Sequence, residues 1–560
     1  MHLRRRFRDK RLSLVFGTGL TQPLGMPSWK ELNQLIADDP TVKGSHLLAT
    51  PTEKTVREQL NNDNYEEVTR LFGNVPEETI ITQRLYEHFK ANRHESEPPD
   101  PKHILEWNAD NQKEWRGIIR EKLYGDSIKL KPEALAPKIL SDHPYLSRLM
   151  PIIQIMPLTI TYNFDDILEI ALTGSSNDVD EILGRKYETT TDISKPSRKQ
   201  SGVIYHPNGY IPRNKMEGRS EKIVLSEDEF AGRMIETMTG QYASLSHHFQ
   251  RSSCIFIGLS LKDNILKNLL RQSAQVTPGH YHYYIYYYSE NKKPSKIEQH
   301  AICESNFAVY NLITLFLSGK EIAALGKLIT DGHSRVKDKE KGEVDDTSFL
   351  RLAGDVGVEP VYHYYIVGAV GAGKSTLVSH FRDLETHDEW VEDRLPELAE
   401  VWGREEGVGA EMIRQARAKR EHIDDWVTDQ FARKNIILWE ESVGIVVSDR
   451  CPLDPLAFTH RSERRAKAKL IISKIRPEPA ETKIREGQVI YLQNDPRALE
   501  IRIRTTDKKY RKPDLEAMQA VLEDIYSIPG SSTIKTALMS SFDIIQRVAY
   551  FIWNHMIRLI

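Results

Sequence analysis

The arrangement of apolar positions predicts strands followed by helices along much of the chain. In "LTITYNFDDILE", residues 158–169, Leu158, Ile160 and Tyr162 alternate with threonines, which is the period of a β-strand. The same succession occurs in "LSLVF" before "SWKELNQLIAD" and in "SCIFIGLSL" before "KDNILKNLLRQ". Strands that alternate with helices predict an α/β fold with a mostly parallel sheet.

A change in composition predicts two domains. From Asp331 the chain reads "DGHSRVKDKEKGEVDDTS", which is charged and almost without apolar residues, as is typical of an exposed linker. We therefore predict a first domain at 1–330, a linker at 331–354 and a second α/β domain at 355–560. Within the first domain, residues from about 40 to 150 are polar with amphipathic helical pieces, which indicates a helical insertion.

Composition narrows the class of protein. The 560 residues are 39% hydrophobic and 28% charged with a formal net charge of -3, which predicts a soluble globular protein and gives no reason to expect nucleic-acid binding. Three widely spaced cysteines, Cys254, Cys303 and Cys451, exclude a disulfide framework and a four-cysteine zinc site within the chain. The basic start "MHLRRRFRDKR" precedes only a short apolar run, and no run reaches membrane length. We expect a cytoplasmic protein without zinc and without membrane attachment.

Polar residues follow the strand pattern of residues 158–162. Asn163 and Asp165 stand where the apolar alternation stops. Because the carboxyl ends of strands in open α/β sheets form the ligand crevice, both are candidate site residues. The alternative is a local one, in which the two side chains form a turn and cap the helix that follows.

A glycine turn follows the first predicted strand. Gly17, Thr18 and Gly19 come directly after "LSLVF", and glycine allows a tight turn whose backbone N–H groups approach a diphosphate. The G-x-G-x-x-G spacing is absent, so this turn alone is equally consistent with a structural role. Further on, Ser28 and Glu31 have the spacing of a capping box at a helix start.

Two more turns complete a set of four. "YHPNGYIP" covers residues 205–212, and "GLSLKD" covers residues 258–263. In this order "GTG", "TYNFD", "HPNG" and "GLSLKD" resemble the SIR2 (silent information regulator, sirtuin-like) family, which binds NAD on a Rossmann-like sheet. The resemblance implies that the first turn holds the pyrophosphate and that Asn163 orients the nicotinamide ribose and water. It assigns the remaining NAD contacts to Asn208, Gly258, Ser260 and Asp263.

One position departs from the family. The family usually has histidine directly before the glycine, whereas here Asn208 stands there and His206 lies two residues earlier. Residues i and i+2 of an extended segment point to the same face, so His206 is our candidate base. If His206 were only a strand-edge histidine, the site would bind NAD without cleaving it.

Cleavage of the nicotinamide–ribose bond explains these residue types. Positive charge builds on the sugar while nicotinamide leaves neutral, so the site needs an orienting amide, Asn163, and a base near neutral pH, His206. Asp165 would support that end of the site. Sirtuin deacylation goes with a four-cysteine zinc module, which the cysteine count excludes. Plain NAD hydrolysis remains, and the chain resembles bacterial anti-phage NADases in which a SIR2-like domain is fused to a sensing domain.

The second domain opens on a phosphate loop. "YYIVGAVGAGKST", residues 364–376, fits G-x-x-x-x-G-K-[ST] with a strand before it and an amphipathic helix after it. Such a loop aims backbone N–H groups at phosphates, Lys374 reaches the β and γ groups, and Ser375 offers a hydroxyl to Mg²⁺. The predicted contacts to ATP or another nucleotide are Gly368, Gly371, Gly373, Lys374, Ser375 and Thr376.

The surroundings of the loop resemble deoxynucleoside and thymidylate kinases. Asp449 and Arg450 end the apolar run "VGIVVSDR", and Arg502 and Arg504 open a basic segment that continues to Lys508, Lys509 and Arg511. The resemblance implies that the Asp-Arg turn lies near an acceptor nucleoside and that the basic segment closes over the phosphates. "HDEWVEDR" would supply the acceptor-side acid, Glu389 or Asp393. A solvated surface remains the alternative for the basic segment.

Together these features predict an NAD+ glycohydrolase gated by a kinase-like domain, in anti-phage defence by NAD depletion. The gate would sense nucleotides, deoxynucleosides or a phage-derived trigger, and we expect a homo-oligomer. One alternative is an active nucleoside or nucleotide kinase with a regulatory NAD-binding domain. The other is a non-catalytic switch that responds to NAD and ATP.

Overall fold

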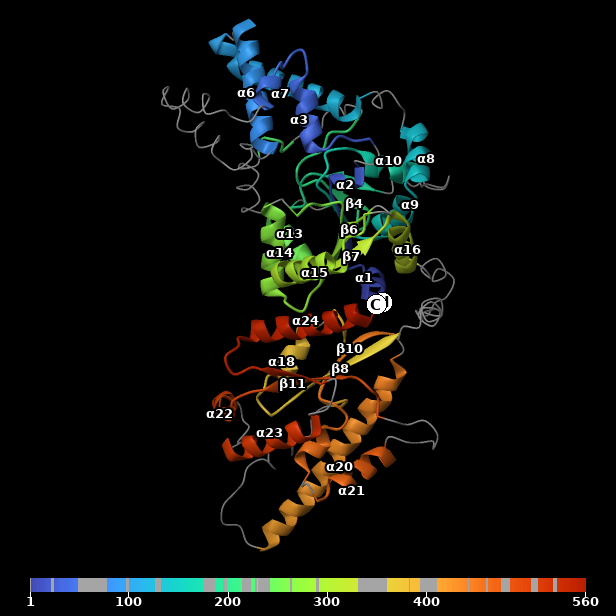
Figure 1. The fold of residues 1–560 in the computed structure, drawn as a ribbon, viewed down its shortest axis with the longest axis vertical. Helices are drawn as coiled ribbons and strands as arrows, with labels where there is room; N and C mark the ends of the chain where they lie inside the picture. Colours follow the sequence, from blue (N-terminus) through green and yellow to red (C-terminus); the bar gives the residue numbers. More distant parts are fainter. Residues whose placement is uncertain are drawn as a thin grey trace. The chain divides into compact units, whose positions relative to one another are not determined.

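A computed structural model shows the fold of the chain (Figure 1). It describes residues 2–559 with the following exceptions: 22–24, 49–77, 97–99, 126–131, 175–186, 195–196, 198, 214–222, 227–228, 230–241, 262–263, 289–291, 331–359, 382, 393–409, 442, 460–461, 475–483, 505–511 and 527–530.

The chain divides into two compact units. We call Arg6–Ser273 with His282–Asp331 the N-terminal unit, and Gly332–Ile560 with Met1–Arg5 and Ala274–Tyr281 the C-terminal unit. The main division therefore falls where the composition changes, near residue 331. The sequence pattern did not predict that Met1–Arg5 and Ala274–Tyr281 belong to the same unit as the last part of the chain. The predicted linker, 331–354, lies outside the described residues.

The N-terminal unit is built on a parallel sheet with the strand order β3-β4-β2-β1-β5-β6-β7. The chain moves from β1 toward one edge and then crosses to β5 on the other side of β1. The switch point of this sheet therefore lies between β1 and β5, where open α/β sheets bind ligands. The strands are β1 Leu12–Phe16, β2 Leu158–Thr161, β3 Glu188–Thr190, β4 Val203–Tyr205, β5 Ser253–Ile257, β6 His282–Tyr287 and β7 Leu312–Leu317.

Helices surround this sheet, and the predicted insertion is helical. The part of residues 40–150 that the structure describes contains helices and no strand, as predicted. Ser28 and Glu31 form the expected capping box at the start of α3. The bounds are α1 His2–Arg8, α2 Thr18–Thr21, α3 Trp29–Ala37, η2 Ser45–Leu48, α6 Glu78–Ser96, η3 Pro101–His103, α7 Ile104–Tyr124, α8 Pro132–Asp142, α9 Pro144–Ile155, α10 Ile167–Gly174, α13 Tyr242–Arg251, α14 Asn264–Val276, α15 Lys296–Tyr310 and α16 Gly319–Thr330.

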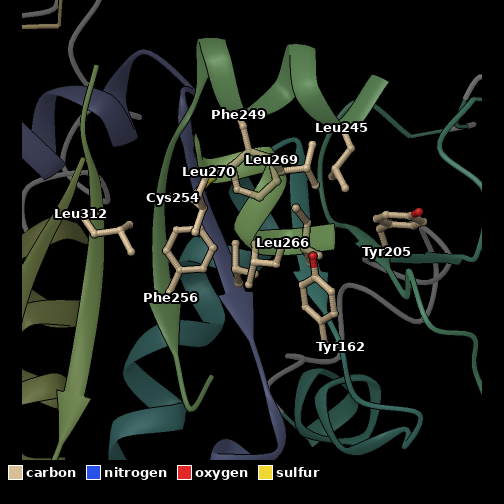
Figure 2. Close-up of a cluster of buried hydrophobic side chains, with 12 residues drawn as sticks. Tyr162, Tyr205, Leu245, Phe249, Cys254, Phe256, Leu266, Leu269, Leu270 and Leu312 are labelled. Atoms are coloured by element: carbon tan, nitrogen blue, oxygen red, sulfur yellow. The ribbon is translucent and has the colours of Figure 1, made fainter. Parts of the chain in front are cut away.

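One cluster of apolar side chains holds two helices against the sheet (Figure 2). Phe249 of α13 stacks on Phe256 of β5 with ring centroids 5.9 Å apart. Leu266 and Leu270 of α14 join them, and each such buried side chain stabilises the fold by roughly 1.5–3 kcal/mol. Every residue of β1 is buried, so both faces of the sheet are covered, as parallel sheets require.

The C-terminal unit has its own parallel sheet with the order β12-β11-β8-β10-β9. Its first strand, β8, is central, so the turn after it lies at a switch point of the strand order. The α/β fold class predicted for both parts is confirmed. The bounds are β8 Val361–Gly368, α18 Lys374–Ser379, β9 Glu385–His387, α20 Ala410–Glu440, β10 Gly444–Asp449, η7 Asp454–Phe458, α21 Arg464–Lys474, β11 Gln488–Gln493, α22 Pro496–Arg504, α23 Lys512–Tyr526, β12 Ser532–Lys535 and α24 Ser541–Leu559. Among the described helices, none has the length and apolar character needed to cross a bilayer.

Candidate functional site

The turns after β1 and β5 interlock at the switch point of the N-terminal sheet. The N–H of Gly17 donates to the carbonyl of Ile257 at 3.0 Å, and that of Gly19 to Gly258 at 2.9 Å. A Cβ on Gly17 would lie 2.6 Å from the carbonyl oxygen of Gly258, and one on Gly258 would lie 2.5 Å from the backbone nitrogen of Leu20. We predicted that these glycine N–H groups approach the diphosphate of a ligand. The structure uses two of them to join the turns, so close packing explains the glycines.

Other predicted contacts lie at the same edge of the sheet. Thr18 begins the short helix α2 and is exposed, and Ser260 is exposed just after β5. Both hydroxyls therefore face solvent beside the interlocked turns. Asp263, the remaining predicted contact on this side, lies outside the described residues.

Asn163 joins the end of β2 to the turn after β1. Its side-chain amide donates to the carbonyl of Gly17 at 3.2 Å and to the hydroxyl of Thr21 at 3.3 Å. The residue is only 2% exposed, and its buried Oδ1 atom has no hydrogen-bond partner among the residues that the structure describes. The side chain thus lies at the carboxyl end of β2, beside the turn after β1.

His206 lies beneath Asn163 rather than in an open crevice. The side chain is completely buried, with Nδ1 2.8 Å from the backbone oxygen of Asn163 and Nε2 3.0 Å from Oε1 of Glu169. Burial lowers the pKa of His206, but the carboxylate of Glu169 outweighs it, and the net pKa is raised. A protonated imidazole donates from both nitrogens and has no lone pair for a substrate proton. In this geometry Asn163 and Glu169 engage both ring nitrogens, and the role of His206 as base stays a prediction.

Glu169 was not foreseen from the sequence. It lies on α10, and its Oε1 also accepts a hydrogen bond from the hydroxyl of Thr189 at 3.0 Å. The available signal was one carboxylate in the otherwise apolar stretch "ILEIAL". A charge is rarely buried without a partner, so such a position points to a buried cation from elsewhere in the fold.

Asp165 and Asp166 directly precede α10, and both side chains are buried. Oδ1 of Asp165 accepts from the N–H of Ile167 at 3.1 Å, which is the local cap left open as the alternative. Burial, followed by the neighbouring carboxylates, raises the pKa of Asp165 to about 7. Asp166 accepts from the N–H of Arg213 at 2.8 Å. Asp165 therefore combines a capping role with a place in an acidic cluster.

Asn208 occupies the family's histidine position. It is 8% exposed, and its backbone oxygen accepts a hydrogen bond from Val224 at 2.7 Å. Its neighbour Tyr210 lies against His206, with ring centroids 4.6 Å apart. The turn after β4 thus brings Asn208 and the buried histidine to one end of the sheet.

The phosphate loop of the C-terminal unit has the backbone that its glycines allow. Gly371 and Gly373 have φ angles of 81° and 88°, in the left-handed region. A Cβ on Gly371 would lie 2.8 Å from Cγ1 of Ile503, so α22 packs directly on the loop. Nζ of Lys374 donates to the carbonyl of Ala369 at 3.1 Å. Burial, with the charge of Arg450 next, lowers the pKa of Lys374 to about 8.

The Asp-Arg turn after β10 meets this loop. Oγ of Ser375 donates to Oδ2 of Asp449 at 2.5 Å, and Nε of Arg450 donates to Oε1 of Glu389 at 2.6 Å. The guanidinium of Arg450 also donates to Oδ2 of Asp454 at 3.0 Å. The structure therefore brings Glu389 to the turn. The other candidate acid, Asp393, lies outside the described residues.

Lys434 is a second functional candidate that sequence analysis missed. It is buried on α20, and Nζ donates to the backbone oxygens of Asp388 and Asp449, the residues before Glu389 and Arg450. Burial lowers its pKa to about 8. The cluster then holds three cations, Lys374, Lys434 and Arg450, and three carboxylates, Glu389, Asp449 and Asp454. Such balance offsets the desolvation of buried charges.

The predicted basic segment begins at the end of α22. Arg502 and Arg504 are exposed there, and Arg504 pairs with Glu500 at 3.3 Å. Thr376, the last predicted loop contact, is exposed on α18. Lys508, Lys509 and Arg511 lie outside the described residues. No group of three or more histidine, cysteine or acidic side chains suited to a metal occurs in the part of the chain that the structure describes.

Comparison with protein families finds one match. Residues 157–308 match the SIR2-like domain family. This range runs from the start of β2 into α15 and holds Asn163, His206 and Glu169, so the predicted SIR2 resemblance is confirmed over it. No curated protein matches the chain.

Among solved structures, the chain is similar to deoxyadenosine kinase from M. mycoides with bound dATP, at 14% identity and a TM-score of 0.27 over 34% of this chain and 98% of that one. The same kinase with the products dCMP and dCDP matches at 12% identity and a TM-score of 0.26, over 34% and 99%. These scores are too low to carry an argument. The kinase-like interpretation therefore rests on the phosphate loop, the strand order and the contacts of the Asp-Arg turn.

Proposed function

We propose that the N-terminal unit is an NAD+ glycohydrolase that cleaves the bond between nicotinamide and ribose. The observation that carries the proposal is the side chain of Asn163. It lies at the carboxyl end of β2, bonded to Gly17, with a buried Oδ1 for which the described part of the chain supplies no hydrogen-bond donor. A buried acceptor without a partner costs roughly 1–3 kcal/mol, so this arrangement suits a donor brought by a ligand, such as a ribose hydroxyl or water.

The residues beneath Asn163 suit the charge of that reaction. NAD supplies the glycosidic bond, and positive charge develops on its ribose as the bond breaks. Asp165, Asp166 and Glu169 place an acidic cluster beside the amide, and pre-oriented charge of the opposite sign stabilises a developing cation. His206 acts as a positioning residue, because its bond to the Asn163 backbone oxygen holds the amide in place. A water molecule then adds to the ribose carbon that nicotinamide has left, and the proton that it loses passes to solvent or to a carboxylate with a raised pKa.

The experiment is to incubate the purified full chain with NAD and to follow nicotinamide by chromatography. We expect Asn163→Ala to slow release by about 100-fold or more, the usual loss when an oriented donor or acceptor in a catalytic site is removed. Asn33→Ala is a matched control, since Asn33 is a buried amide of the same unit on α3. Equal rates for Asn163→Ala and the wild-type chain would overturn the proposal.

A second candidate function, phosphoryl transfer, is favoured by the contacts of the C-terminal unit. Ser375 and Asp449 form the pair that holds Mg²⁺ in phosphate-loop enzymes, and Glu389 is placed by Arg450 to accept a proton from a nucleoside hydroxyl. A phosphate donor would bind the loop through Lys374. Transfer from labelled ATP to deoxynucleosides, lost in Lys374→Ala, is the expected result of this activity.

We further propose that nucleotide occupancy of the C-terminal unit gates NAD cleavage, as in an anti-phage defence protein that works as a homo-oligomer. Support comes from the presence of a SIR2-like region and a nucleotide-binding fold in one chain. Adding ATP, deoxynucleosides or extract from infected cells should change nicotinamide release, and light scattering should report assembly. Release that is identical under every addition would contradict gating.

A further inference from the structure

The N-terminal unit contains a cavity that the proposed function does not use. Its volume is about 1050 Å³, and its wall includes Arg11, Leu158, Val203 and Ser252. Leu158 and Val203 begin β2 and β4, while Arg11 and Ser252 directly precede β1 and β5. These are the amino ends of the parallel strands. The wall also includes Thr191, which follows β3, and Tyr210, which follows β4, so on this side the cavity extends toward the carboxyl ends. The interlocked glycine turns and Asn163 are not among its lining residues.

The wall of this cavity has the chemistry of an anion site. Four basic side chains line it, and they come from three separate segments: Lys10, Arg11, Lys199 and Arg251. Hydroxyl groups stand between them: Thr189, Thr190, Thr191, Ser197, Ser244 and Ser252. Phosphate oxygens are bound by this mixture of cationic and hydroxyl donors.

Carboxylates also line the cavity, and local bonds engage two of the three. Glu188 accepts from the hydroxyl of Ser197 at 2.8 Å and from the N–H of Lys199 at 3.2 Å. Asp192 accepts from the N–H and hydroxyl of Ser194 at 3.0 and 2.6 Å. The third is Asp9. The four basic side chains outnumber these three carboxylates, so the net charge of the wall is positive and favours an anion.

We propose that this cavity binds a phosphorylated small molecule of nucleotide size. Small-molecule sites have volumes of about 300–1,000 Å³, so the space accommodates a nucleoside together with its phosphates. The phosphates would lie against Lys10 and Arg251. The uncharged part would lie toward Tyr210 and Ile193, which provide the aromatic and apolar part of the wall.

Two wall residues also touch the buried ion pair of the candidate active site. The hydroxyl of Thr189 donates to Oε1 of Glu169, and the ring of Tyr210 lies 4.6 Å from that of His206. A ligand that displaces either residue changes the surroundings of the His206–Glu169 pair. The cavity is therefore a regulatory site, and this regulatory part of the inference rests on the proposed NAD hydrolysis.

Binding is tested with ADP on the full chain carrying Lys374→Ala, which removes the phosphate-loop contact. Calorimetry should show one ADP site that Lys10→Glu and Arg251→Glu each weaken by about tenfold or more, as expected when a charge-assisted bond is replaced by repulsion. Lys327→Glu is the control, because Lys327 is an exposed lysine of the same unit on α16, away from the cavity.

Thermal unfolding of Lys10→Glu and Arg251→Glu distinguishes a loss of ADP binding from a loss of folding. The Lys10 and Arg251 side chains are exposed, so both variants should unfold at the temperature of the parent chain. ADP affinities equal to that of Lys327→Glu, or no ADP binding by the parent, would overturn the site.

Regulation is tested with Thr189→Val, which keeps the side-chain shape and removes the hydroxyl bonded to Glu169. ADP should still bind this variant but should no longer change the rate of nicotinamide release. If ADP changes the rate of nicotinamide release in Thr189→Val as it does in the wild-type chain, coupling through the Thr189–Glu169 hydrogen bond is overturned. If the chain releases no nicotinamide under any condition, the proposed hydrolase activity fails, while the calorimetric result for the cavity stands.

Discussion

The two candidate sites differ in how their buried charge is arranged. The N-terminal cluster contains three carboxylates, Asp165, Asp166 and Glu169, with the cations His206 and Arg213. The cluster around the phosphate loop has three cations and three carboxylates. Acidic side chains beside Asn163 suit the proposed reaction, in which a cation develops, and Asp165 strengthens this effect only where it has lost its proton. A balanced cluster instead holds its own cations in place for the nucleotide proposed to bind there.

The largest effect should follow from breaking the N-terminal ion pair. Glu169→Gln leaves the His206 ring buried without its anionic partner, and breaking a buried pair costs about 3–5 kcal/mol. We expect a loss of that order in the free energy of unfolding, measured with urea. The pKa of His206, followed by NMR, should fall because burial then dominates.

The matched control is Glu321→Gln, which changes an exposed glutamate at the start of α16. The comparison of the two sites fails if Glu169→Gln unfolds like this control. It also fails if the histidine titrates as in the wild-type chain.

Lys374→Ala should give the next largest effect. Removal of the lysine that faces the phosphates is expected to weaken ATP binding by about 100-fold, because a charge-assisted contact is lost in a water-poor loop. Calorimetry with ATP and Mg²⁺ measures this. NAD cleavage in the absence of nucleotide should be unaffected, and unchanged ATP binding would refute the placement of the loop.

Lys434→Met tests the charge balance of the C-terminal cluster. The change removes one of the three cations, so the three carboxylates Glu389, Asp449 and Asp454 are no longer balanced. It also removes the hydrogen bonds by which Lys434 joins the backbone at Asp388 and Asp449. ATP affinity should therefore fall by about tenfold. Lys434→Arg, which keeps the charge, should lose less. Equal affinity in the Met variant and the wild-type chain would show that the balance is irrelevant to binding.

A further effect concerns the dependence of stability on pH and involves Asp165. Because its pKa is raised to about 7 in the folded chain, the native state holds a proton that the unfolded state has released, and stability falls as pH rises from about 4 through 7. Asp165→Asn keeps the cap of Ile167 and removes the titration. Between pH 5 and pH 8 it should abolish roughly 2–3 kcal/mol of that decline. If the free energy of unfolding changes with pH by the same amount in Asp165→Asn and in the wild-type chain, the raised pKa of Asp165 is contradicted.

Much of the fold could be predicted because its signals are local. The phosphate loop is a run of consecutive residues, the capping box spans Ser28 to Glu31, and strand periodicity needs only four or five positions. The residues around Asn163 were found for the same reason, since polar residues that interrupt a strand mark its carboxyl end. The partner of His206, Glu169, was not predicted, because a two-residue spacing says nothing about a residue on a helix elsewhere in the fold.

The partners that define each site are distant in sequence. His206 and Glu169 are 37 residues apart, and Arg450 and Glu389 are 61 apart. By itself the sequence predicted the α/β fold class, several strands and helices and the phosphate loop, because hydrophobic periodicity and glycine geometry act over a few residues. Only the tertiary structure decided which charges are buried together. Ion pairing and desolvation depend on distances in space that no local pattern encodes.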